Sequence, residues 1–416
     1  SMSWRTTTSL CGCIIMSGPF GSSQWMYSSG ASGFYDFPIT NSVRLGGTGH
    51  LTHTNSSDSA SRQKFTFATW LKITSLSTAH HQLFDATNNF GRIYFTADDS
   101  GGNTVRVLMG DGSSNGNLVT TRKFRDASSW YHIVVAVDTT EGTAGDRIKI
   151  YINGVRETSF AAETDVNQNV TTPVGGTALE LIGAQAGPDT YFKGYLAETH
   201  YIVNAQLTAA SFGETKNDIW VPKDTAGLTY GTNGYRLQYK QTGTSANSSG
   251  IGADTSGNDN HWTPVNLVAS DVVPDSPTNN FATLNPLDAV ISNSAYTISE
   301  GNTKVILDGN ASYLDIAGTM QVGPGGKWYW EQYNKNPGSG NTGNPQTALC
   351  PANQSAHQPA TVPSGSVDLV IGTRDGDEEV YMIAVDLDNG FAYRGNEGSW
   401  SNGANLDDIV SGEGTG

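Results

Sequence analysis

The sequence predicts an all-β protein assembled from antiparallel β-sandwiches. Its 416 residues include 49 glycines, and only 15% of the chain is charged, a composition that favours turns and strands over helices. Residues 65–73 (FTFATWLKI) alternate as a strand does. Isoleucine fills every second position of 148–152, and Asn153-Gly154 then supplies the two positive-φ residues of a type I′ hairpin turn. Many short strands separated by such turns are typical of a sandwich.

The pattern divides the chain into four parts. Residues 1–34 form an aromatic, Gly/Ser-rich arm, residues 35–212 a first sandwich, residues 213–285 an irregular connector, and residues 286–416 a second sandwich. The connector includes a Val-Pro-Asp-Ser-Pro stretch whose two prolines interrupt any strand ladder.

Strands are expected in both β regions between clusters of turn-forming residues. In the first sandwich they are 42–45, 65–73, 81–85, 92–95, 105–109, 130–138, 147–155, 179–183 and 194–203. In the second they are 305–307, 313–316, 327–333, 367–372, 380–387 and 391–394. One helical turn is expected at 207–212, with Thr208 as its N-cap.

Charge and composition exclude several classes of function. The net charge is −16, so a polyanion would be repelled and we expect no nucleic-acid partner. No run of about 18 apolar residues is present, so we expect no membrane insertion. Three cysteines do not indicate a disulfide framework. The Ser1-Met2-Ser3 start lacks the basic region and apolar core of a signal peptide.

Three segments, in this order, carry a family resemblance. They are Trp130–Asp138, Ile148–Val155 and the stretch from Phe192 to Val203, and together they resemble laminin-G/pentraxin-like (concanavalin A-like) jelly rolls. Gly326–Glu331 and Ile383–Gly390 resemble a SPRY domain, which is also concanavalin-like. The resemblance therefore implies two concanavalin A-like antiparallel β-sandwiches joined by an irregular connector.

The second domain departs from the SPRY pattern at its end. A SPRY domain continues for several strands beyond the hairpin that corresponds to Asp388–Gly390, whereas this sequence stops at Gly416. Either the domain is truncated, or the N-terminal arm or another subunit completes its sheet. The sequence leaves these alternatives open.

A narrower resemblance concerns the setting of the protein. Gly33–Asp36, Asp254–Asn258, Trp262–Pro264 and Ala282–Pro286 resemble segments of marine bacteriophage tail-fibre and appendage proteins. This implies a virion location, extracellular action and contact with other virion subunits. An arm rich in aromatic residues would also suit exchange between subunits of a homotrimer, which is a hypothesis.

Candidate binding residues follow from the first resemblance. The resemblance implies a Ca²⁺ site, because pentraxin-like relatives bind Ca²⁺ through two loops. The corresponding loops of this sequence contain side chains with oxygen donors, which Ca²⁺ prefers: Asp85, Asn88, Asn89, Gln185 and Asp189. Sugars bind to exposed aromatic rings flanked by hydrogen-bonding groups; the loop aromatics that qualify are Phe90, Tyr191 and Phe192.

Catalysis is not expected. His132 occupies a strand position that the family pattern makes structural, and Glu198 lies alone in its strand. The E-x-D-x-x-E string of concanavalin-like glucanases does not occur, and Asp386 and Asp388 lead directly into a turn. We therefore expect a non-enzymatic virion appendage or adhesin that binds host-surface carbohydrate. The alternatives are a structural virion decoration or spacer and a polysaccharide depolymerase.

Overall fold

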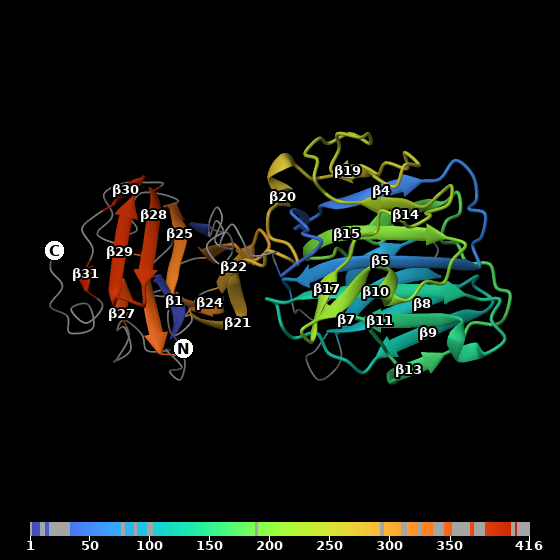
Figure 1. Cartoon of the computed structure of the whole chain (residues 1–416), viewed down its shortest axis with the longest axis horizontal. Helices are drawn as coiled ribbons and strands as arrows, with labels where there is room; N and C mark the ends of the chain where they lie inside the picture. Colours follow the sequence, from blue (N-terminus) through green and yellow to red (C-terminus); the bar gives the residue numbers. More distant parts are fainter. Residues whose placement is uncertain are drawn as a thin grey trace. The chain divides into compact units, whose positions relative to one another are not determined.

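The chain folds into two compact units (Figure 1). We call Ser32–Asn280 the sandwich unit, and Ser1–Ala31 together with Phe281–Gly416 the terminal unit. The computed structural model describes residues 2–8, 13–15, 34–75, 80–86, 90–97, 103–187, 190–291, 295–308, 314–322, 326–335, 345–351, 367–369, 379–400 and 404–405.

The described residues form strands and turns without any α-helix. Three short 3₁₀ turns are present: η1 (Ala144–Asp146), η2 (Ala209–Ser211) and η3 (Ala269–Asp271). Thr208 precedes η2 as predicted, but its side chain makes no capping hydrogen bond. Within this described part of the chain, no helix is long and apolar enough to cross a membrane.

One sheet of the sandwich unit, the β5 sheet, has the strand order β12-β11-β10-β5-β15-β3-β20, with β18 also paired to β15. Its strands are β12 (Val155–Arg156), β11 (Ile148–Ile152), β10 (Trp130–Asp138), β5 (Lys64–Ile73), β15 (Gly194–Val203), β3 (Ser42–Leu45), β20 (Val272–Val273) and β18 (Tyr235–Leu237). The predicted β11–β12 hairpin is confirmed: Asn153 and Gly154 have φ of 47° and 84°, as a type I′ turn requires.

The facing sheet, the β7 sheet, has the order β13-β9-β8-β7-β6-β14-β4-β19. Its strands are β13 (Phe160–Thr164), β9 (Asn115–Thr120), β8 (Asn103–Gly110), β7 (Gly91–Ala97), β6 (His81–Asp85), β14 (Leu179–Ile182), β4 (His50–Thr54) and β19 (Thr263–Val265). Neighbouring strands in both sheets run antiparallel.

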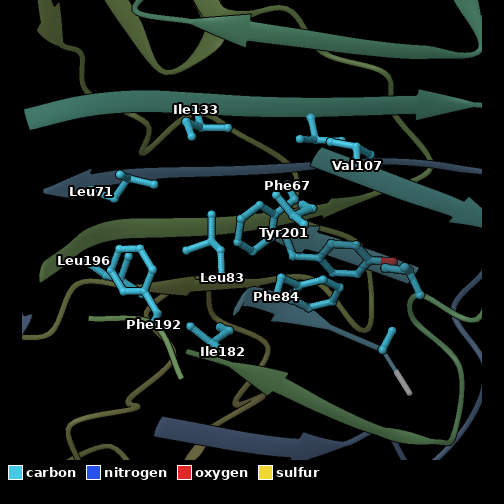
Figure 2. Close-up of a cluster of buried hydrophobic side chains, with 14 of the residues drawn as sticks. Phe67, Leu71, Leu83, Phe84, Val107, Ile133, Ile182, Phe192, Leu196 and Tyr201 are labelled. Atoms are coloured by element: carbon cyan, nitrogen blue, oxygen red, sulfur yellow. The ribbon is translucent and has the colours of Figure 1, made fainter. Parts of the chain in front are cut away.

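The main hydrophobic core lies between these two sheets (Figure 2). Phe67, Leu71 and Leu196 reach it from the β5 sheet, and Leu83 and Val107 reach it from the β7 sheet. Because side chains alternate along each strand, the predicted pattern places these residues on the inward faces. The observed core therefore follows directly from the alternation in the sequence.

A second apolar layer covers the outer face of the β5 sheet. Ala68, Val134 and Ala136 point outward there and are covered by Phe212 and Tyr230. The segment 213–280 adds the hairpin β16 (Gly213–Lys216) and β17 (Ile219–Pro222), and also β18, β19 and β20. Residues predicted as an irregular connector thus belong to the compact sandwich unit.

The two ends of the sandwich unit are joined by hydrogen bonds. The Ile39 N–H donates to Thr278 Oγ1 at 2.9 Å, and Ser276 Oγ donates to the Ile39 carbonyl at 2.5 Å. Lys72, which is fully buried, donates from Nζ to Asp275 Oδ2 at 2.9 Å. The chain therefore enters and leaves this unit at adjacent positions.

The terminal unit contains two further sheets, and each includes one strand from the N-terminal arm. The first has the order β21 (Leu284–Ile291), β24 (Leu314–Val322), β1 (Met2–Thr8), β26 (Pro345–Pro351) and β27 (Val367–Leu369). The second has the order β22 (Ala295–Ser299), β23 (Lys304–Asp308), β2 (Cys13–Ile15), β25 (Lys327–Lys335), β28 (Glu379–Asp386), β29 (Phe391–Asn396) and β30 (Ser399–Trp400), with β31 (Ala404–Asn405) paired to β29.

Both arm strands are interior strands. β1 pairs with β24 and β26, and β2 pairs with β23 and β25. The chain's own arm therefore contributes a strand to each of these two sheets, as one of the predicted alternatives has it. The predicted all-β sandwich class is confirmed, while the SPRY likeness of the second domain stays a prediction.

Candidate functional site

The buried carboxylate of Asp85 connects the two loops predicted to bind ligand. Asp85 ends β6 and is fully buried. Its Oδ2 accepts a hydrogen bond of 2.9 Å from the Ala186 N–H, and its Oδ1 lies 3.4 Å from Arg92 Nε. The loop that follows β14 is thereby held against the end of β6.

That loop presents a tyrosine ring beside polar groups. Thr190 Oγ1 donates to Gln185 Oε1 at 2.9 Å, and the Gln185 N–H donates to the Thr190 carbonyl at 3.1 Å. These bonds close the loop so that Ala184 bridges to Tyr191. Tyr191 is half-buried and its ring centroid lies 5.9 Å from that of His50. The loop therefore combines a half-buried aromatic ring with amide and hydroxyl groups.

The other two predicted aromatics differ in exposure. Phe90 is half-buried, and Gly112 approaches it so closely that an added Cβ would lie 3.1 Å from its ring. The prediction of Phe192 as a sugar-binding ring is wrong, because this residue is 0% exposed. Figure 2 shows its ring inside the core, near Leu196. The Phe192 N–H donates to the Gly183 carbonyl at 2.9 Å, and burial leaves its ring no face for a ligand.

The described part of the predicted calcium site does not fit a cation by itself. Asp85 is already paired with the Arg92 guanidinium, which would repel a divalent ion, and Gln185 Oε1 is bonded to Thr190. Among the described residues, no group of three His, Cys, Asp or Glu side chains could hold a metal. The remaining predicted ligands, Asn88, Asn89 and Asp189, lie outside the described residues, so calcium stays a prediction.

His132 has the structural surroundings that its strand position predicts. Its Nδ1 accepts a hydrogen bond of 3.2 Å from Trp220 Nε1, and its ring packs 4.8 Å from that of Trp70. Burial lowers the pKa of His132 to about 3, so the imidazole is neutral at physiological pH. Its place between two tryptophans in the packed outer layer favours a packing role over that of a general base.

Glu198 is engaged in a buried ion pair. It lies at a bulge in β15, where its φ is 46°. Its Oε2 accepts from Arg236 Nε at 2.9 Å and its Oε1 from Gln238 Nε2, also at 2.9 Å. Because both oxygens are occupied and the side chain is only 5% exposed, this carboxylate is not presented to a substrate.

Asp386 ends β28 and stabilises a turn. It pairs with the Lys327 ammonium, and it accepts hydrogen bonds from both the backbone N–H and the side chain of Asn389. The hydrogen bond from Lys327 lowers the pKa of Asp386 to about 2. These bonds give Asp386 a structural role at the start of the turn.

Glu180 is a buried carboxyl that the sequence patterns did not single out. It precedes Ile182 by two residues in β14, so it points into the sandwich interior, where it is 2% exposed. Its Oε1 accepts from the Gly175 N–H at 2.7 Å. Burial raises the pKa of Glu180 to about 7. The available signal was a glutamate at an inward position of an alternating strand.

Glu180 lies among buried hydroxyl groups. A Cβ added at Gly175 would lie 2.4 Å from both Ser59 Oγ and Tyr201 Oη. The hydroxyl of Tyr235 is buried without a hydrogen-bond partner, and its ring lies 5.5 Å from that of Tyr201. This polar cluster lies inside the sandwich, so it does not present a binding surface.

The strand order, the core and the loops define a sandwich that matches a known sequence family. Residues 45–211 match the profile of the family described as the concanavalin A-like lectin/glucanases superfamily. The sequence of this segment is similar to that of concanavalin A-like domains. No curated protein sequence matches the chain.

Solved structures share the sandwich at low similarity. A candidate carbohydrate-binding protein from Bacteroides ovatus is 13% identical, with a TM-score of 0.40, and the alignment covers 57% of this chain and 60% of that one. The heptameric SAP-like pentraxin of Limulus polyphemus is 16% identical, with coverages of 43% and 80% and a TM-score of 0.31.

Domain 4 of the extracellular arabinanase AbnA from Geobacillus stearothermophilus, solved with arabinotriose, is 22% identical. Its alignment covers 47% of this chain and 84% of that domain, with a TM-score of 0.31. Scores of this size support no conclusion about the ligand of the sandwich unit.

Proposed function

We propose that the chain binds carbohydrate without hydrolysing it, through the surface formed by Phe90, Gln185, Thr190 and Tyr191, here called the loop-end site. The observation that carries the proposal is the half-buried Tyr191 ring in the same loop as the bonded Gln185–Thr190 pair. The matching family, which is named for lectins and glucanases, supports carbohydrate as the ligand class.

The chemistry of the loop-end site suits a sugar. The C–H face of a pyranose ring stacks on an aromatic side chain, and amide and hydroxyl groups beside the ring bond to sugar hydroxyls. Tyr191 and Phe90 supply rings, while Gln185 and Thr190 supply donors and acceptors. The buried Asp85–Arg92 pair holds the loop in place beneath them.

Binding without hydrolysis is favoured because the carboxyl groups inside the described sandwich are engaged. Glycoside hydrolysis requires two carboxyl groups placed on either side of the scissile bond. Glu198 is ion-paired with Arg236, and Glu180 points into the core against Gly175. Neither is placed to act on a bound glycan at the loop-end site.

A glycan array probed with wild-type protein and with Tyr191→Ala tests the proposal. Loss of the ring should weaken binding about five-fold or more, on the scale of aromatic stacking energies. Val155→Ala, at a residue that is 60% exposed in the hairpin β11–β12, is the matched control and should bind as wild type does. Equal binding by Tyr191→Ala and wild type would exclude the loop-end site.

Two further experiments separate carbohydrate binding from the alternative functions. Repeating the array in EDTA tests the predicted calcium, since a drop in binding would require a bound divalent ion. Release of reducing ends from a bound polysaccharide would establish a depolymerase and overturn the proposal. No binding to any glycan would favour the structural virion decoration.

For the biological setting, we propose a phage-type virion appendage that attaches to host cell-surface glycans outside the cell. Support comes from the likeness of Gly33–Asp36 and Asp254–Asn258 to tail-fibre segments. Other virion subunits would then be partners, and a homotrimer remains the proposed assembly. Light scattering of the purified protein tests that assembly, and a monomeric mass would contradict it.

A further inference from the structure

One outer sheet face of the terminal unit carries a group of aromatic side chains. Register across β25, β28 and β29 places Tyr329, Ala384 and Tyr393 side by side on this face. Phe391, two residues before Tyr393, shares it, and so does Trp400 on β30. The four strands lie next to one another in Figure 1. We call the four rings of Tyr329, Phe391, Tyr393 and Trp400 the aromatic face.

Three rings of the aromatic face are exposed and Tyr329 is half-buried, whereas large apolar side chains on the opposite face of β25 and β28 are buried. Trp400, Phe391 and Tyr393 are 49%, 38% and 37% exposed. On the opposite face, Trp330 and Ile383 are buried at 7% and 0%. The sheet therefore directs one set of side chains into the unit's core and presents the rings on its outside.

Two rings of the aromatic face approach each other across the sheet. Tyr329 and Trp400 come from strands three places apart, a separation of about 14 Å between backbones, yet their ring centroids are 6.0 Å apart. The small residues Ala384 and Gly395 lie between them. A Cβ added at Gly395 would fall 3.2 Å from Trp400 Cε3. The two side chains thus extend toward each other across the sheet, beside Met382, whose Cε would lie 2.5 Å from the added Cβ.

Polar groups are interspersed with these rings. Tyr329 Oη donates to Glu331 Oε1 at 2.5 Å, and Asp386 pairs with Lys327 on the same face. Such a mixture provides apolar ring faces together with carboxylate and hydroxyl groups at their edges. It differs from the centre of a protein–protein interface, which is depleted in charged residues.

Chemistry therefore favours a polysaccharide as the occupant. Pyranose C–H faces stack on flat aromatic surfaces, while the sugar hydroxyls bond to carboxylates at the edges. Because the chain has a net charge of −16, a polyanionic glycan would be repelled. A neutral polymer of hexopyranoses meets both conditions.

We propose that the aromatic face is a second carbohydrate-binding surface, specific for neutral polysaccharide chains. The proposal extends the carbohydrate binding proposed for the loop-end site to the terminal unit, and it uses none of the same residues. It assigns stacking to Tyr393 and Trp400 and hydrogen bonding to Glu331.

Affinity gel electrophoresis of the full chain through gels containing neutral β-glucan, α-glucan or galactomannan tests the proposal. Trp400→Ala and Tyr393→Ala should each weaken retardation about five-fold, as loss of one stacking ring does. Trp400→Phe keeps a ring and should retain binding. Leu287→Ala, at an apolar residue of the same unit that is 65% exposed, should behave as wild type.

Tyr191→Ala distinguishes the two sites in the same gels. Loss of retardation in Trp400→Ala, with retention in Tyr191→Ala, supports the aromatic face even where the loop-end site fails. Loss only in Tyr191→Ala overturns the aromatic face and leaves the loop-end site standing. Failure of the wild-type protein to bind any of the three polymers overturns the aromatic face, as does a Trp400→Phe variant that loses binding as fully as Trp400→Ala.

Discussion

Replacing Glu180 by glutamine should change how the stability of the protein depends on pH. Burial raises the pKa of Glu180 from an ordinary value of 4.5 to about 7, so the folded protein holds this proton more tightly than the unfolded chain does. The stability linked to that proton is fully present below pH 4.5 and is lost as the pH rises through 7. Wild type should therefore lose stability across this interval.

The two pKa values correspond to a loss of about 3 kcal/mol in the free energy of unfolding. Glu180→Gln has no proton to lose, and its amide oxygen can still accept from the Gly175 N–H. The variant should match wild type within about 1 kcal/mol at pH 4. At pH 8 it should be more stable by up to about 3 kcal/mol.

Urea unfolding at pH 4, 6 and 8, followed by tryptophan fluorescence, measures these differences. Glu163→Gln is the matched control, because it makes the same chemical change at an exposed position of β13 and should leave the pH profile unchanged. A Glu180→Gln profile that runs parallel to that of wild type would refute the assignment of a buried, proton-binding carboxyl. Destabilisation of the variant at pH 8 would refute it as well.

Two further substitutions test the packing around the β5 sheet. Arg236→Met leaves the Glu198 carboxylate buried without its ion-pair partner, so chemical unfolding should show a loss of about 3–5 kcal/mol of stability. Adding Glu198→Gln to this variant should recover part of the loss, and no recovery would contradict the pairing. Gly154→Ala introduces a Cβ 2.4 Å from the Trp220 ring at a φ of 84° and should lower stability by at least about 1 kcal/mol, so an unchanged thermal midpoint would contradict the turn geometry.

The features that the sequence predicted well are local. Alternation in 148–152 and the Asn153-Gly154 pair define a hairpin within ten residues, because strand period and turn chemistry need no distant partner. The same reasoning located β5 and β10, whose inward residues form the core. The local sequence was sufficient for prediction wherever strand alternation alone decides on which face of the sheet a residue lies.

The features that the sequence did not predict depend on contacts between residues that are far apart in the chain. Phe192 was predicted as a surface ring, but packing from both sheets places it in the core. The segment 213–280 lacks strong periodicity, yet Trp220 and Tyr230 cover the outer face of the β5 sheet. A short polar-rich stretch cannot reveal which face of a sheet it will cover, since the partner lies far away in the sequence.

The paired ends of the sandwich unit have a consequence for how the terminal unit folds. β1 and β2 lie inside sheets whose other strands follow residue 283, so synthesis makes these two strands long before their partners. While the sandwich unit is unfolded, it is a long flexible loop between the arm strands and their partners, and closing this loop costs entropy. Once the sandwich unit folds, Ile39 and Thr278 are hydrogen-bonded neighbours, so the flexible connection between the arm strands and their partners is much shorter. Folding of the sandwich unit thus prepares the assembly of the terminal unit, and we expect the sandwich unit to fold first.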